Sequence, residues 1–558
     1  MTTRPDSRRY PTPLLFAVFF LGLFAVHAPL LRLPYFWDEA GYYIPAAHDL
    51  LLSGSLIPFS TLSNAHPPLV MAYLALAWKI LGFTPVVTRT AMLLIAAFTL
   101  LGVFRLAQRV ANTEVAVASA ICTALYPVFF TQSSLAHLDL AVAGLTFWGL
   151  LAYVEDRRPA IAFWFSLAVL AKETAILAPL ALFAWTLLAT AAERRKNKAH
   201  GASRGSDPQN QAAPEGRKNL TANGGATFAL LLFPCIPLAL WYAYHYHRTG
   251  YLLGNPEFFR YNVQATLHPL RILLALGLRW WQLLAYLNLY LLTLATALAM
   301  FRKPIHDRQR IAIPVQFAFL SVIVAYAFAM AVIGGAVLAR YMLPVVPLVI
   351  IVGLSTLRRR VRIWPAIVGI VALAFVAALF INPPYGLSLE DNLVYRDYTL
   401  LHQRAENFLE ARYPMARVLT AWPASDELSR PYLGYVTRPL QVVRIEDFTA
   451  EQLFAASGLR TKFDVALVFS TKYEPPHPLF ERWATWQRWK TEFFGYHRDV
   501  PPAAATQILG GQVVYEERRP GQWVAVIEIE RVEEARSDAK MPGILSNSGH
   551  SLVLVRQR

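Results

Sequence analysis

Long apolar segments recur along most of this chain, and they restrict its fold more than any other feature of the sequence. Many are about 17 to 25 residues long, the length that an α-helix needs to cross a bilayer. Hydrophobic residues make up 56% of the 558 residues and charged residues only 16%, which is less charge than a soluble protein of this length carries. The sequence therefore predicts a mostly α-helical protein that crosses a membrane many times.

The chain is strongly basic, with 52 Lys and Arg against 36 Asp and Glu, a net charge of +16. In a soluble protein this excess would suggest a nucleic-acid partner. Here many basic residues lie in short loops between apolar segments, where they mark the cytoplasmic side of a membrane protein. We therefore expect the lipid bilayer as a partner, and no nucleic acid. The two cysteines, Cys122 and Cys235, lie in apolar segments and are expected to be buried thiols.

Eleven segments are predicted to span the membrane, with the N-terminus in the cytoplasm and the C-terminus outside. They are about Thr12–Leu33, Val86–Phe104, Val115–Thr131, Leu140–Val154, Pro159–Ala171, Thr174–Ala192, Phe228–Tyr246, Ile272–Met300, Ile311–Ile333, Met342–Leu357 and Trp364–Ile381. This assignment places the basic residues around Arg105, Arg157 and Arg359 on the cytoplasmic side, as the positive-inside rule requires.

One further apolar segment, from Pro67 to Leu81, is too short for a span. As a helix it would be roughly 24 Å long, against a hydrocarbon core of about 30 Å, and it contains Lys79. Counted as a span, it would also turn Arg105 and Arg109 to the outer side. We therefore expect an interfacial or partly re-entrant helix here.

Composition divides the chain into three parts. Residues 1–382 form a predicted transmembrane module, with a first outer loop at 33–66 and a cytoplasmic linker at 193–224. The polar, small-residue composition of residues 197–224 predicts disorder in that part of the linker. Residues 383–531 are expected to form a small α/β domain outside the membrane, and 532–558 a disordered tail apart from a short strand at Leu552–Val555. The strands of the domain are expected at Arg417–Trp422, Gln441–Ile445, Asp464–Ser470, Gln512–Glu516 and Trp523–Ile529, with helices at Tyr398–Ala411 and His477–Lys490.

The first outer loop contains two adjacent carboxylates, Asp38 and Glu39, in the segment PYFWDEAGYY. Aromatic residues on both sides of the pair are typical of the membrane–water interface. A carboxylate held there can accept a proton from an incoming hydroxyl without the full cost of burial in hydrocarbon. The segment is equally consistent with a solvated loop after a membrane helix, and Glu39 to Leu52 can form a short amphipathic helix on the surface.

The predicted topology collects further polar side chains at the same outer side. They are His66, Asp139, Lys172, Glu173, Arg248, Arg260, Arg340 and the adjacent Tyr341. Each one alone is ordinary, because charges gather at helix ends. Together they combine carboxylates suited to general-base catalysis with basic side chains suited to a phosphate or pyrophosphate. Their shared position fits a substrate with a lipid tail and a polar head, so Arg248 and Arg260 are also candidate substrate-binding residues.

Five motifs, WDEAGYY, HPPL, AHLD, AKET and ARYMLPVVP, occur in an order that resembles the bacterial membrane glycosyltransferases of the protein O-mannosyltransferase-like group. This group has the GT-C fold and includes the aminoarabinose transferase that acts on lipid A. The resemblance covers about residues 12–382, and its specific part is the acidic pair after the first span. It implies a protein of the bacterial cytoplasmic (inner) membrane that uses a polyprenyl-phosphate sugar. The acceptor stays open among a glycolipid, a polysaccharide and a protein.

The resemblance implies catalytic roles for three carboxylates. Asp38 is implied as the base that deprotonates the acceptor hydroxyl. Glu39 is implied as its neighbour that orients or helps bind the sugar, and Asp139 as a second acid beside the acceptor or donor sugar.

The resemblance also implies a binding site for the lipid phosphate. Arg340, followed by Tyr341 in the RYxLP motif, is implied as a phosphate ligand, and His66 as a neighbour of the same phosphate. Lys172 and Glu173 match a motif that varies among relatives. A histidine is largely neutral near pH 7, so His66 attracts a phosphate less than a lysine would.

The chemistry implied is one displacement at the anomeric carbon, which inverts that centre. Because Asp38 and Glu39 are adjacent, they cannot easily lie on both sides of a sugar, which disfavours a covalent intermediate. The sequence contains no evident DxD motif of the nucleotide-sugar enzymes, and we expect no obligatory metal and no other cofactor.

Two other functions are alternatives. A transporter or flippase for a lipid-linked or anionic solute would place charged residues near the bilayer midplane, where the predicted spans are nearly free of them. A membrane-anchored binding protein would explain neither eleven spans nor the acidic pair. The glycosyltransferase is therefore the favoured hypothesis.

Overall fold

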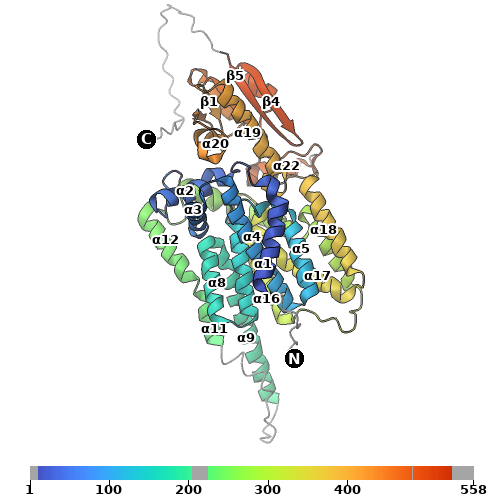
Figure 1. The fold of residues 1–558 in the computed structure, drawn as a ribbon. Coiled ribbons are helices and arrows are strands. Elements are labelled where there is room, and N and C mark those ends of the chain that lie inside the picture. Colours follow the sequence, from blue (N-terminus) through green and yellow to red (C-terminus); the bar gives the residue numbers. More distant parts are fainter. Residues whose placement is uncertain (1–10, 204–223, 481, 531–558) are drawn as a thin grey trace, which may run out of the picture.

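Two layers make up the molecule, a bundle of apolar helices and a smaller α/β domain on one end of it (Figure 1). A computed structural model describes residues 11–203, 224–480 and 482–530. It confirms the predicted fold class of a mostly helical membrane protein with a small C-terminal α/β domain. Six helical segments in the described residues are long and apolar enough to cross a membrane, and five shorter apolar helices accompany them. The number of eleven spans stays a prediction.

The helices of the bundle follow the predicted apolar segments closely. They are α1 (Thr12–His27), α4 (Pro85–Val110), α5 (Thr113–Leu125), α6 (Pro127–Gln132), α7 (Asp139–Val154), α8 (Arg158–Ala171), α9 (Leu177–Ser203), α11 (Gly224–Leu232), α12 (Cys235–Thr249), α13 (Pro256–Asn262), α14 (Pro269–Leu284), α15 (Leu289–Met300), α16 (Ile313–Val332), α17 (Val346–Arg360) and α18 (Trp364–Phe380). Pro is present at the first turn of many of them, where the missing N–H costs no helical hydrogen bond.

Three predicted spans are each divided into two helices. Pro127 separates α5 from α6, and Pro234 lies between α11 and α12, because proline lacks the N–H that continues a helix. Leu287 and Asn288 separate α14 from α15 with left-handed φ values of 46° and 69°. The segments are mostly apolar on both sides of each break, so hydropathy alone did not show these breaks.

The predicted cytoplasmic linker is helical where it begins, because α9 continues to Ser203. The expectation of disorder from residue 197 is therefore wrong for its first part. Residues 204–223 lie outside the described residues, as do residues 1–10 and the tail 531–558 with its expected strand.

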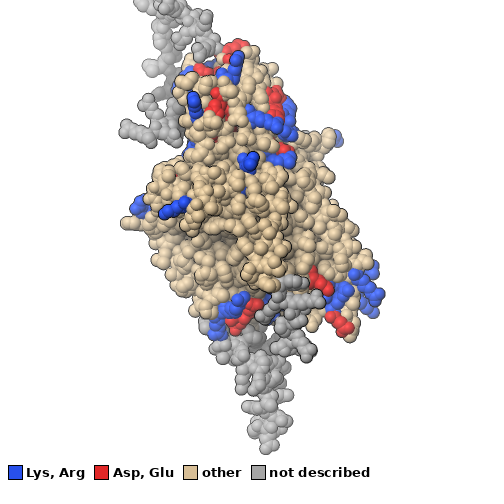
Figure 2. All heavy atoms as spheres, viewed as in Figure 1, with Lys and Arg blue, Asp and Glu red and all other residues tan. Residues whose placement is uncertain are grey.

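Charged side chains leave a broad band of the bundle almost free on the face shown in Figure 2. They gather at the end of the bundle farther from the α/β domain, and on the domain itself. An apolar belt between two charged ends is the surface that a bilayer requires.

The first outer loop folds against the α/β domain. A π-helical turn (Glu39–Tyr43) leads into α2 (Ile44–Ser53), which packs on α3 (Leu69–Leu81) at the same end of the bundle (Figure 1). At 13 residues, α3 has the short length expected of an interfacial helix. A helix is present here as predicted, but its first part is not on the surface, because Ala40, Tyr43 and Ile44 are fully or almost fully buried.

The α/β domain contains a five-stranded sheet in the order β2-β1-β3-β5-β4. Its strands are β1 (Arg417–Thr420), β2 (Gln441–Arg444), β3 (Val465–Phe469), β4 (Gly511–Arg519) and β5 (Gln522–Ile529), all at predicted positions. β1 is parallel to β2 and β3, while β5 is antiparallel to β3 and β4. Its helices are α19 (Val394–Arg412), α20 (Ala424–Ser429), α21 (Ala450–Ser457), α22 (Ala484–Phe494) and α23 (Pro502–Leu509). The helix predicted from His477 begins only at Ala484.

Direct contacts join the domain to the first outer loop. Tyr35 donates its backbone N–H to Leu433 at 3.1 Å, and the hydroxyl of Tyr435 donates to the carbonyl of Tyr35 at 3.0 Å. Trp422 lies on Gly41 so closely that a Cβ at that glycine would be 2.6 Å from the indole nitrogen. The outer domain therefore helps fix the loop that contains Asp38.

Candidate active site

A large cavity lies between the end of the helix bundle and the α/β domain. Its volume is about 1610 Å³, above the roughly 300–1,000 Å³ of common small-molecule pockets. Apolar side chains of α14 and α16, such as Leu278 and Met330, form part of its lining, and Trp422 of the outer domain forms another part. A ligand with an apolar and a polar portion fits such a lining.

Arg340 is the centre of the polar part of this site. It lies just before α17 with a side chain that is only 2% exposed. Its guanidinium donates to the carboxylates of Asp38 and Glu390, with an Nη1–Oε2 distance of 2.7 Å to Glu390. Its Nε lies 3.4 Å from Oδ2 of Asp139, and its Nη1 donates to Nδ1 of His137 at 2.9 Å. Three carboxylates thus share one arginine.

Asp38 is the most accessible of these carboxylates. It lines the cavity and its side chain is 31% exposed, whereas Asp139 and Glu390 are almost fully buried. The preceding residue, Trp37, has a left-handed φ of 47°, which is uncommon for a bulky side chain. Its indole packs edge to face on Trp422 at 5.0 Å, and such surrounding contacts are what hold a strained residue in place.

Glu39 does not line the cavity, so the structure gives its predicted catalytic role no support. It is fully buried in an ion pair with Arg89, with two oxygen–nitrogen distances of 3.2 Å. It also accepts the backbone N–H groups of Phe36 at 2.8 Å and Ala136 at 2.6 Å. Its hydrogen-bonding capacity is therefore used to join the first outer loop to α4 and to the loop before α7.

Asp139 lies behind the cavity wall rather than in it, so the structure gives no support to its predicted place beside a sugar. Its Oδ1 accepts from Nζ of Lys172 at 2.7 Å, and both side chains are buried. Lys172 does line the cavity, and its ammonium lies 4.3 Å from the ring centre of Tyr341. Asp139 therefore acts through the two cations that it positions, Lys172 and Arg340.

His66 and Glu173 both line the cavity, as predicted, and they contact each other. Nδ1 of His66 lies 3.0 Å from Oε2 of Glu173. The carboxylate orients the imidazole, whose Nε2 is then the nitrogen left to contact a ligand. His66 therefore lines the cavity together with a carboxylate, and its place beside a phosphate stays a prediction.

Arg248 and Arg260 lie away from the cavity. Arg248 lies at the end of α12 and Arg260 on α13, each exposed, and neither lines the cavity. The sequence predicted that they belong to an outer loop but not the direction in which its helices turn, and their binding of a substrate stays a prediction.

Comparison with solved structures places this arrangement in a known architecture. ArnT from Cupriavidus metallidurans bound to undecaprenyl phosphate matches with a TM-score of 0.50 and 13% identity, over 92% of this chain and 97% of that chain. The chain has the GT-C fold. The Archaeoglobus fulgidus oligosaccharyltransferase in complex with Zn and sulfate matches with a TM-score of 0.45 and 12% identity, over 92% of this chain and 73% of that chain.

A family model described as dolichyl-phosphate-mannose-protein mannosyltransferase matches residues 65–204. That segment contains His66, Asp139, Lys172 and Glu173. No curated protein sequence matches the chain. The resemblance to GT-C glycosyltransferases that use polyprenyl-phosphate-linked sugars is confirmed by the family model and the fold.

Sequence reasoning missed two members of the arginine cluster. Glu390 comes ten residues after α18, next to Asp391, in the part of this GT-C chain that the motifs do not cover. Burial raises the pKa of Glu390 to about 8 although Arg340 opposes the shift. Burial and the same arginine lower the pKa of His137 well below its ordinary value, which keeps the imidazole neutral. An acid pair directly after the last apolar segment was the signal that could have identified Glu390.

Arg279 is a third missed residue, inside the predicted span Ile272–Met300. Its guanidinium donates to the carbonyl of Leu338 at 2.7 Å and to the carbonyl of Met330 at 3.2 Å. Both acceptors lie in or next to the segment that leads to Arg340. Arg279 therefore positions the phosphate-binding candidate without reaching the cavity itself.

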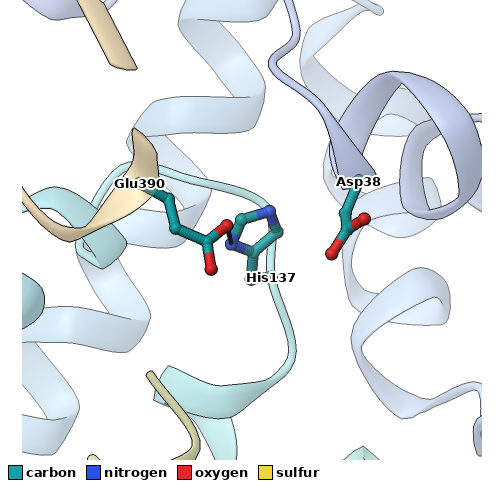
Figure 3. A group of neighbouring side chains, drawn as sticks. All are labelled: Asp38, His137 and Glu390. Atoms are coloured by element: carbon teal, nitrogen blue, oxygen red, sulfur yellow. Dashed lines mark ion pairs between the residues drawn. The ribbon is translucent and has the colours of Figure 1, made fainter. Parts of the chain in front are cut away.

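Asp38, His137 and Glu390 form a group that has the spacing of a metal site. Their ligand atoms lie within 4.8 Å of one another, and the imidazole lies between the two carboxylates (Figure 3). Arg340, however, donates to all three side chains. A divalent ion at this position would have to displace that guanidinium, so the group fits Arg340 better than a metal.

Proposed function

We propose that this protein transfers a sugar from a polyprenyl-phosphate donor to an acceptor hydroxyl at the outer face of the bacterial cytoplasmic membrane. The proposal rests above all on one contact, between the accessible carboxylate of Asp38 and the buried guanidinium of Arg340, at the wall of a cavity next to the apolar bundle. A proposed general base, Asp38, thereby lies next to a proposed phosphate-binding residue, Arg340.

The donor is proposed to bind with its phosphate at Arg340 and Lys172. Both are buried cations that line the cavity, and charge-assisted hydrogen bonds to phosphate are strong in such surroundings. The apolar residues of α14 and α16 continue the cavity away from these cations and suit a polyprenyl chain. The fold relative ArnT, whose structure holds undecaprenyl phosphate, supports this choice of lipid.

The transfer is proposed as a single displacement. Asp38 takes the proton of the acceptor hydroxyl while the hydroxyl oxygen forms a bond to the anomeric carbon. The bond from that carbon to the phosphate oxygen breaks, and the electron pair leaves with the polyprenyl phosphate, stabilised by Arg340 and Lys172. Attack and departure occur on opposite faces of the sugar, so the anomeric centre inverts. Glu39 lies in a buried ion pair and is not placed to act as a second carboxylate.

The same arginine also suggests an order of binding. With no donor bound, the guanidinium of Arg340 donates a hydrogen bond to the carboxylate of Asp38 and so occupies one of its oxygens. A donor phosphate competes for this guanidinium. Donor binding is therefore proposed to release Asp38 for the acceptor proton, so that the base becomes effective only when a sugar is present.

The acceptor is proposed to enter from the side of the α/β domain. Trp422, Tyr473 and Trp483 of that domain line the cavity, and aromatic faces are common partners of sugar rings and lipid headgroups. The acceptor class stays open among a glycolipid, a polysaccharide and a protein.

Mass spectrometry of envelope glycolipids and glycans tests this function. Cells that lack the gene are complemented with the wild type, with Asp38→Asn, or with the control Asp156→Asn, which changes an exposed acid at the far end of the bundle. We expect one sugar modification that the wild type and the control restore and that Asp38→Asn does not. Full restoration by Asp38→Asn at equal protein level would remove Asp38 from the mechanism.

A further inference from the structure

A second group of titratable side chains lies inside the α/β domain, away from the cavity. His402 and Glu406 are one turn apart on α19, and Glu427 approaches them from α20. All three side chains are at most 1% exposed. Nδ1 of His402 lies 2.7 Å from Oε2 of Glu427 and 3.6 Å from Oε1 of Glu406.

This group lacks the cation that accompanies the acids of the cavity. In the described part of the chain, neither Glu406 nor Glu427 forms an ion pair with a lysine or arginine, and the ion-pair partner of each is His402. Both oxygens of Glu406, Oε1 of Glu427 and Nε2 of His402 are buried without a hydrogen-bond partner. Buried carboxylates without compensation are costly, so the arrangement calls for a positive charge among them.

We propose that His402, Glu406 and Glu427 bind a divalent metal ion that holds α19 to α20. One imidazole and two carboxylates form a ligand set that Zn²⁺, Mn²⁺ or Fe²⁺ accepts. The ligand atoms of the three residues lie within 4.8 Å of one another. Tetrahedral zinc with bonds near 2.0–2.1 Å needs ligand atoms about 3.3 Å apart, and the two measured separations of 2.7 and 3.6 Å bracket that value.

The local structure already orients the three ligands. The i,i+4 spacing puts His402 and Glu406 on one face of α19. The imidazole of His402 stacks on Tyr398 at 4.0 Å and meets Phe469 edge to face at 4.4 Å, which fixes its plane. Zinc is the form in which we propose to test the site, since it accepts these ligands without a redox change.

The alternative occupant is a single proton shared by the two carboxylates. Burial and the neighbouring Glu427 raise the pKa of Glu406 well above its ordinary value, which favours a protonated carboxyl where no metal is bound. Metal binding would release that proton. The two occupants differ in an observable way, because only the metal makes stability depend on added Zn²⁺ and on chelators.

The ion would have a consequence for the cavity. α20 begins two residues after Trp422, which lines the cavity, and Trp422 lies on Gly41 beside the loop of Asp38. A metal that joins α19 to α20 would fix the position of this tryptophan. We infer a structural role for the metal in the outer domain rather than a part in the chemistry.

Metal analysis of the purified full-length protein tests the proposal. Wild type, Glu406→Gln and the control Glu410→Gln are incubated with Zn²⁺, freed of excess and analysed for zinc by mass spectrometry. Glu410 is on the same helix, one turn away, and accepts backbone N–H groups at the domain surface. We expect the wild type and Glu410→Gln each to retain one more zinc ion per protein molecule than Glu406→Gln. Equal zinc in the wild type and Glu406→Gln overturns the proposal.

Thermal unfolding gives an independent readout. Zn²⁺ should raise the Tm of the wild type by about 5 °C over the same protein in EDTA, and should leave the Tm of Glu406→Gln unchanged. In EDTA the variant should be at least as stable as the wild type, because glutamine removes a buried titratable group while keeping the shape. A further variant, Glu390→Gln, must retain the zinc response. Loss of the response in Glu390→Gln but not in Glu406→Gln would assign the metal to the cavity instead and refute the site in the outer domain.

Discussion

Asp38 and Glu39 are adjacent acids in one motif, and each forms an ion pair with a buried arginine. The two carboxylates differ in their exposure and in their other hydrogen bonds. Glu39 is fully buried, and its oxygens accept from Arg89 and from two backbone N–H groups. Asp38 is 31% exposed at the cavity wall and contacts Arg340. The carboxylate of Glu39 therefore has no free position for a ligand, whereas the carboxylate of Asp38 has one.

The local helical geometry accounts for the difference. Asp38 and Glu39 lie at the start of a π-helical turn, and neighbouring side chains of a helical turn point in different directions. One acid therefore faces the bundle and the other the cavity. Glu39 therefore stabilises the fold, whereas Asp38 is accessible to a ligand.

The largest effect is expected for Asp38→Asn. Removing a general base costs about 10² to 10⁴ in rate, and asparagine keeps the shape and can still accept from Arg340. Turnover with a polyprenyl-phosphate sugar should fall by that factor, while the Tm stays near that of the wild type. If Asp38→Asn lowers the Tm together with the turnover, Asp38 stabilises the fold as Glu39 does.

Glu39→Gln should have the opposite signature. It leaves the buried guanidinium of Arg89 without a counter-charge, which costs about 3–5 kcal/mol of stability in such pairs. We expect a lower Tm and less folded protein in the membrane, with near-normal turnover per folded molecule. The double variant Glu39→Gln, Arg89→Met, which removes both charges, should recover part of the stability; no recovery would mean that the ion pair is not the cause.

Arg340→Lys should weaken donor binding more than it slows chemistry. A lysine is a single-point cation and cannot contact Asp38 and Glu390 at once as the guanidinium does. Loss of one charge-assisted hydrogen bond to phosphate is worth about 1.5–3 kcal/mol. The KM for the lipid donor should rise accordingly, and an unchanged KM would place the phosphate elsewhere.

A smaller effect should appear with pH. The pKa of Glu390 is raised to about 8, so its carboxyl is neutral below that pH and gains a negative charge above it. That charge lies against Arg340 and repels a donor phosphate, so donor affinity should fall as the pH rises through about 8. The KM should change about fivefold. Glu390→Gln should bind the donor equally well on both sides of this pH; a KM that still rises in Glu390→Gln would exclude Glu390 as the titrating group.

The smallest effect is expected for Arg248→Ala and Arg260→Ala. Both side chains are exposed and away from the cavity, and such surface substitutions change stability by less than about 0.5 kcal/mol. Turnover and donor KM should stay within about twofold of the wild type. A large rise in donor KM would extend the binding site to α12 and α13.

Much of the architecture was predictable because a bilayer imposes simple rules on sequence. The apolar segments, the five strands and the short helix α3 follow from length, hydropathy and the position of basic residues. Asp38, Arg340 and Lys172 were predicted for one site, and all three line its cavity. These residues belong to motifs at the ends of predicted spans, where topology alone brings them to the same side.

The parts of the site that were not predicted depend on contacts between segments far apart in the sequence. A hydrophobic pattern along the chain does not indicate such contacts. Glu39 resembled a functional acid until its partner was seen, and that partner, Arg89, lies 50 residues away in the first turns of an apolar helix. Glu390 belongs to the α/β domain, and it contacts Arg340, which lies 50 residues earlier in the chain. The direction of α12 and α13, which turns Arg248 and Arg260 away, is set by packing rather than by local sequence.

The close packing of the Trp422 indole on Gly41 limits which α/β domains can be exchanged between related proteins. The outer domain and the first loop fit only as a matched set, because any side chain in place of that glycine hydrogen would meet the indole. An exchange of outer domains between related enzymes must therefore transfer the tryptophan and keep the glycine. A chimera that breaks this match is expected to disturb the loop of Asp38 even though every residue of the polar cluster is unchanged.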